Sequence, residues 1–115
     1  MKIETVDYLG RTSLSWAARN GHTEVVQLLL NAKVNIEAAD NDGWTSLSQA
    51  ARNGHTEVVQ LLLNANANIE AMDSEYGQTS LVWAAENGHS EVVQLLLNAN
   101  AKIEAVDKSG RTSLV

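Results

Sequence analysis

Apolar residues recur along the chain in short blocks that have the spacing of amphipathic helices. In the first block, Leu14, Ala17 and Ala18 fall on one helical face. Thr12, just before this block, is of a type that caps helix N-termini. Gly21, just after it, supplies the left-handed conformation that commonly ends a helix. The pattern predicts a first helix of about eight residues.

A second apolar block, at residues 25–30, follows directly. It comes after Thr23 and Glu24, and an acidic side chain is favourable in the positive first turn of a helix. The segment 31–43 is polar and contains Asp and Gly, so we expect a protruding loop there. The unit is therefore predicted to be two helices followed by a long loop.

This unit repeats. The segment NGHTEVVQLLLNA occurs at residues 20–32 and 53–65, and NGHSEVVQLLLNA occurs at 87–99. Glycines that precede the first helix are spaced by 33, 34 and 33 residues, at Gly10, Gly43, Gly77 and Gly110. A helix of eight residues is too short to be stable alone, so the repeats must stack on one another. We predict one domain, residues 1–115, with repeats at 3–35, 36–68 and 69–102 and a partial fourth at 103–115.

The pattern GxTxLxxAAxxGHxEVVxLLL resembles the ankyrin repeat, and the resemblance covers essentially the whole chain. It implies an all-α solenoid of stacked antiparallel helix pairs with β-hairpin fingers. The segment DSEYGQTSLVWAAENGH is also similar to ankyrin arrays of fungal NOD-like receptors, and a designed ankyrin protein would look much the same.

The chain departs from the family where ankyrin repeats usually have Thr-Pro-Leu-His. It has TSLS at Thr12 and Thr45 and TSLV at Thr79, and it contains no proline. Proline at a first helical position is stabilising, so its absence predicts a loss of stability. By the resemblance, the family histidine bonds the capping threonine. Ser15 and Ser48 can partly replace it, whereas Val82 cannot.

Composition narrows the function classes. The sequence is 44% hydrophobic and 19% charged, which is typical of a globular protein. A net charge of −6 argues against nucleic acid as a partner. There is no cysteine, no apolar run long enough for a membrane helix, and no signal peptide in MKIETVDYLG. We expect a soluble, cytoplasmic protein.

The residue types that could act in catalysis or metal binding recur at the same positions of each repeat, which favours structural roles. His22, His55 and His89 lie at equivalent positions of stacked units that are about 8–10 Å apart, too far apart to share a zinc ion. Serines and glutamates are also periodic, and no asymmetric catalytic cluster stands out. We expect no enzyme activity, cofactor or metal. A repeated aspartate before each glycine is expected to stabilise a turn, at Asp7, Asp40, Asp73 and Asp107.

Positions that differ between near-identical repeats point to binding. The first two repeats differ at eight of 33 positions, and half of these lie in the fingers or on the first helix. By the family resemblance, such positions form a concave face that contacts a protein partner. Trp16 and Trp83 correspond to Gln49, so we expect half-buried residues there. The candidate partner-binding residues are Tyr8, Leu9, Arg11, Trp16, Arg19, Asn41, Asp42, Trp44, Gln49, Arg52, Ser74, Glu75, Tyr76, Gln78, Trp83 and Glu86.

The function that follows is a protein–protein interaction module, with a structural scaffold or engineered repeat protein without a dedicated ligand as the alternative. The arginines favour a partner with an acidic patch. Both ends of the array carry apolar interface residues, so weak head-to-tail self-association is a further expectation.

Overall fold

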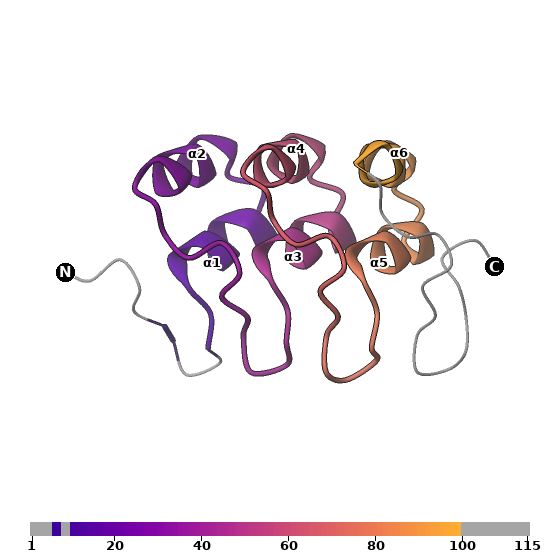
Figure 1. Ribbon diagram of the computed structural model, residues 1–115, viewed down its shortest axis with the longest axis horizontal. Helices are drawn as coiled ribbons and strands as arrows, with labels where there is room; N and C mark the ends of the chain where they lie inside the picture. The colour runs from indigo at the N-terminus through magenta and orange to yellow at the C-terminus, as the bar shows by residue number, and fades with distance from the viewer. Residues whose placement is uncertain (1–5, 8–9, 100–115) are drawn as a thin grey trace.

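The computed structural model describes residues 6–7 and 10–99 of the chain. Three helix pairs stand side by side, with α2, α4 and α6 in one row and α1, α3 and α5 in the other (Figure 1). The all-α architecture predicted from the sequence is confirmed for the described residues. The predicted partial repeat at 103–115, with its finger, lies outside them. The helices are α1 Ser13–Arg19, α2 Thr23–Asn31, α3 Ser46–Arg52, α4 Thr56–Asn64, α5 Ser80–Glu86 and α6 Ser90–Asn98.

Threonine caps start the first helix of every pair, as predicted. The Thr12 hydroxyl accepts a hydrogen bond from the backbone N–H of Ser15, and the Ser15 hydroxyl oxygen accepts one from the backbone N–H of Thr12. The second pair repeats this capping box. In the third pair only the hydrogen bond to the threonine hydroxyl remains, because Val82 has no side-chain oxygen to accept one from the backbone N–H of Thr79. The sequence-based expectation for Ser15, Ser48 and Val82 is therefore confirmed.

The turn between the two helices of a pair is tight. Gly21 has a φ of +72°, the left-handed conformation expected from its position. His22 occupies the N-cap of α2 without a side-chain cap bond, and α2 begins at Thr23 as predicted.

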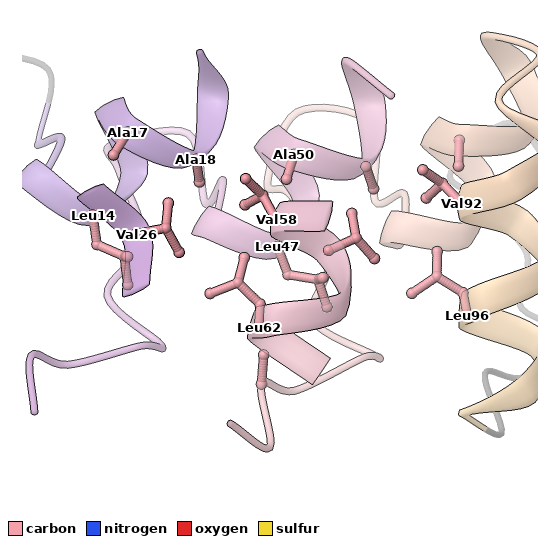
Figure 2. Packing of buried hydrophobic residues seen from close by; sticks show 14 of the residues in the cluster. Leu14, Ala17, Ala18, Val26, Leu47, Ala50, Val58, Leu62, Val92 and Leu96 are labelled. Carbon is pink, nitrogen blue, oxygen red and sulfur yellow. The ribbon is translucent and has the colours of Figure 1, made fainter. Parts of the chain in front are cut away.

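The core lies between the two rows of helices and runs continuously through the array (Figure 2). Each first helix contributes a fully buried leucine and small alanines, which allow close approach of the neighbouring helices. Each second helix contributes valine and leucine. Stability therefore comes from stacking of each repeat on the next. The largest fully buried apolar side chains are Leu14, Leu47, Leu62, Leu81, Leu96, Val26, Val58, Val59 and Val92.

Histidines fasten each repeat to the one before. The Nε2 atom of His55 lies 2.9 Å from the carbonyl oxygen of Arg19, and His89 makes the same contact with Arg52 at 2.8 Å. The ring of His55 also lies against Gly21, where a Cβ atom would be 2.6 Å from Nδ1. The structural role that the sequence suggested for these histidines is confirmed for His55 and His89.

The loops that join the pairs project on one side of the array as fingers (Figure 1). The second finger is closed by hydrogen bonds from Asp40 N–H to the Trp44 carbonyl and from Gly43 N–H to the Asp40 carbonyl, both 3.0 Å long. Adjacent fingers touch, since Ser74 N–H donates to the Asp42 carbonyl at 2.8 Å. These are bonds of turns, and residues 10–99 contain no strand. Strand pairing of the expected β-hairpin is therefore not seen in the described fingers.

The first repeat has the same apolar residues that pack between repeats elsewhere in the array, but they are more exposed to solvent there. Val58 on α4 is 1% exposed, whereas the equivalent Val25 on α2 is 46% exposed. Leu28, farther along α2, is 67% exposed. The outer side of α2 is therefore apolar and open to solvent.

Candidate functional site

A buried or half-buried aspartate organises each described finger. The Asp40 carboxylate accepts hydrogen bonds from the backbone N–H groups of Asp42 and Trp44, both 2.9 Å long. The Asp73 carboxylate binds the N–H groups of Tyr76 at 2.7 Å and Gln78 at 2.9 Å. The turn-stabilising role predicted for the repeated aspartate is confirmed for these residues and for Asp7, while Asp107 lies outside the described residues.

The carboxylates of Asp7 and Asp73 also hold tryptophans of the first helices. The indole N–H of Trp16 donates to Asp7 at 2.9 Å, and that of Trp83 donates to Asp73 at 3.2 Å. An indole N–H that leaves water needs such a partner, so the aspartate fixes both the ring position and the finger. Finger and helix face are in this way one rigid unit.

Three aromatic rings meet across two repeats. Trp44, from the second finger, lies against Trp83 on α5 with ring centroids 4.5 Å apart. Tyr76, from the third finger, meets Trp83 edge-on at 5.8 Å. The edge-on contact is a geometry that aromatic pairs prefer, and the planes of Trp44 and Trp83 are tilted by 37°. The cluster joins the second and third repeats and leaves Tyr76 half exposed, at 50%.

Arginines lie over the tryptophan rings. The Arg11 guanidinium is 4.7 Å from the Trp16 ring centroid, and that of Arg19 is 5.6 Å from the same ring. The Arg52 guanidinium lies over two rings, 5.8 Å from Trp44 and 5.6 Å from Trp83. All of these distances are within the range of cation–π attraction. We call this surface the tryptophan face; it consists of Trp16, Trp44, Trp83, Tyr76, Arg11, Arg19 and Arg52.

Acidic groups border the tryptophan face on its third-repeat side. A hydrogen bond to Glu75 raises the pKa of the Tyr76 phenol above its ordinary value of 10.0, and the negative charges of Glu75 and Asp73 act in the same direction. Glu86, the last residue of α5, accepts a hydrogen bond of 2.8 Å from the Gln78 amide. The tryptophan face is thus cationic in the first two repeats and bordered by acid in the third.

Most of the predicted partner-binding residues are accessible, but three are not. Trp16 is 39% exposed, as the half-buried expectation required, whereas Trp83 is 8% exposed. The expectation is wrong for Trp83 because Trp44 and Tyr76 cover its ring. Gln49 and Gln78 are also buried, at 7% and 2%. Tyr8 and Leu9 lie outside the described residues. The exposed or half-exposed members are Arg11, Trp16, Arg19, Asn41, Asp42, Trp44, Arg52, Ser74, Glu75, Tyr76 and Glu86.

Two positioning residues were missed as members of this site. Asp7 and Asp73 were interpreted as turn residues only, although each also binds a tryptophan N–H. The sequence contains no separate signal for this role, because Asp40 also lies nine residues before Gln49, in the repeat that has no tryptophan on its first helix.

Other kinds of site find little support in the described part of the chain. Residues 6–7 and 10–99 contain no group of three His, Cys, Asp or Glu side chains placed to hold a metal ion. Within the same residues, none of the helices has the length and apolar character needed to cross a membrane.

Comparison with protein families agrees with the repeat geometry. A family model described as ankyrin repeats (3 copies) matches residues 2–73 and 66–115. No curated protein matches the sequence. Since the family match spans nearly the whole chain and the described residues form stacked helix pairs joined by fingers, the chain belongs to the ankyrin repeat family.

Proposed function

We propose that this chain binds a protein partner through the tryptophan face and the adjoining fingertips. Ankyrin repeats are generally protein-interaction modules, and the match to the family covers the chain. The observation that carries the proposal is the accumulation of Trp, Tyr and Arg on the first helices and on the fingers that lead into them. These residue types dominate the binding energy of protein interfaces.

The side chains are also preorganised. Trp16 is held by Asp7, and Trp44 is held by ring contact with Trp83, so neither must be ordered when a partner binds. Immobilising a free side chain at an interface costs about 0.5–1.5 kcal/mol, and a fixed surface avoids much of that cost. The proposed role requires neither catalysis nor a cofactor. The net charge of −6 favours a protein over a nucleic acid as the partner.

A random-peptide display selection tests the proposal. Selected peptides are titrated against the chain and against single alanine variants at Arg11, Trp44, Tyr76 and Glu86. We expect several of these variants to lose more than about 1 kcal/mol of binding free energy while keeping their helical circular dichroism.

The matched control is a set of alanine variants on the second helices, at Glu24, Glu57 and Glu91, which are exposed first-turn residues away from the tryptophan face. If these variants lose binding while the tryptophan face variants keep it, the binding surface lies on the second helices and the proposal is wrong. Peptides that depend on neither set would favour a structural scaffold without a dedicated ligand.

A further inference from the structure

Within the described residues, the arginines of the tryptophan face have no acidic partner of their own. The described residues contain four cationic side chains of Lys or Arg, and three of them are Arg11, Arg19 and Arg52. None of the three forms an ion pair within residues 6–7 and 10–99, and the Nε atom of Arg11 is buried there without a hydrogen-bond partner. The guanidinium groups of Arg19 and Arg52 lie over tryptophan rings, and this contact leaves their N–H groups free to bind carboxylates.

Charge along the face follows a fixed order. Arg19, Arg52 and Glu86 are the last residues of α1, α3 and α5, and so occupy equivalent places in three successive repeats. Helices that stack in this way are about 8–10 Å apart. Figure 1 shows the three helices in one row, so the sequence of charges along the row is plus, plus, minus.

The spacing matches an extended peptide. A peptide in the extended polyproline II conformation has three residues per turn and rises about 3.1 Å per residue, so side chains three residues apart lie on the same side and are separated by about 9 Å. Resting on the proposed function, we infer that the tryptophan face recognises an extended segment with two acidic residues and one basic residue at three-residue intervals, in the order acid, acid, base. The carboxylates meet Arg19 and Arg52, and the base meets Glu86.

The chain's net negative charge does not oppose this pairing at physiological salt. At 0.15 M ionic strength, charges separated by more than about 8 Å in solvent are largely screened, so the contacts at the face outweigh the distant carboxylates. The hydrogen bond from the Gln78 amide holds the Glu86 carboxylate in position for this pairing.

Two synthetic peptides of identical composition test the order of charges. One has the pattern E-x-x-E-x-x-K and the other E-x-x-K-x-x-E, with the same uncharged residues at x. Reversing the first pattern would not be a valid control, because a peptide can bind in either direction. The exchanged pattern fails in both directions, since Arg52 then faces lysine and Glu86 faces glutamate.

We expect the unaltered chain to bind the exchanged peptide about tenfold more weakly, since two exposed attractions become repulsions. The double variant Arg52→Glu/Glu86→Arg keeps the net charge and changes the order on the face to plus, minus, plus. It should prefer the exchanged peptide instead. The single variant Glu86→Arg should lose the preference, and thermal unfolding checks that each variant remains folded.

Equal binding of the two peptides by the unaltered chain overturns the inference, as does the absence of binding to both. An unchanged preference in the double variant also overturns it. The display selection separates this failure from failure of the proposed function. If selected peptides depend on Trp44 but share no order of charges, the proposed binding surface stands and only the inferred charge order is wrong.

Discussion

The Nε2 atom of His89 lies 2.8 Å from the carbonyl oxygen of Arg52. A carbonyl oxygen only accepts hydrogen bonds, so Nε2 carries the proton. Arg52 therefore takes part in two interactions at once, since its backbone anchors the third repeat while its guanidinium lies on Trp44 and Trp83. Array stability and the proposed binding surface are joined at this residue.

Removing the histidines should weaken the stack at specific joints. His55→Ala and His89→Ala each lose one inter-repeat hydrogen bond, so we expect the free energy of unfolding in urea to fall by about 1 kcal/mol in each. His22→Ala is the matched control, because His22 has no such bond within the described residues. Equal losses in all three variants would show that the contact to the preceding carbonyl is not what the histidines contribute.

Glycines at the inter-helix turns give a second test of the same joints. Gly54 and Gly88 have φ values of +74° and +72°, so alanine meets the same backbone strain of about 1–2 kcal/mol at both. A Cβ at Gly54 would also lie 2.6 Å from Nδ1 of His89, whereas nothing lies within 4 Å at Gly88. Gly54→Ala should therefore destabilise more than Gly88→Ala, as measured by urea denaturation.

The excess should disappear in the His89→Ala background, where the ring is gone. A double-mutant cycle between Gly54 and His89 measures this coupling. Additive effects of the two substitutions would argue that the ring moves aside freely.

Proline at the first helical position should stabilise the chain. Ser13, Ser46 and Ser80 each follow a capping threonine, and proline there restricts the unfolded chain, so we expect a gain of about 0.4–1 kcal/mol per site in unfolding free energy. Ser13 is exposed and gives the least ambiguous test, while Ser46 and Ser80 are 1% and 2% exposed and must also accommodate the ring. A lower melting temperature for Ser13→Pro would contradict the position of the helix start.

The two tryptophans in contact should differ in their contribution to stability. Trp83 is buried and hydrogen-bonded to Asp73, so Trp83→Ala should lower the unfolding free energy by about 3–5 kcal/mol. Trp44 is only half-buried, so Trp44→Ala should cost less. Coupling between the two closely packed indoles produces a paired signal in circular dichroism, which either substitution should remove while Trp16→Ala preserves it.

The sequence was sufficient for the helix pairs because each is locally encoded. Thr12 caps, Gly21 terminates, and the apolar spacing between them has the helical period, so repetition of the unit gives the architecture. Contacts between repeats depend on geometry that no single repeat contains. The position of Trp83 could not be derived from its own repeat, because its cover comes from Trp44 of the repeat before.

The exposure of the candidate binding residues was predicted only in part, for the same reason. Most of the variable positions in the described residues are accessible, yet Gln78 and Gln49 are buried. Variation between repeats reports that a position tolerates change, and a buried position that packs against a neighbouring variable residue can tolerate it as well as an exposed one.

The third finger is one residue longer than the second, yet the helices that follow the two fingers begin in the same way. Asp73 binds the N–H of Gln78, five residues on, where Asp40 binds that of Trp44, four residues on, and both fingers end at a capping threonine. A residue inserted at a fingertip thus changes the finger without shifting the stacked helices. A finger can therefore change its length and its exposed side chains without a compensating change in the core.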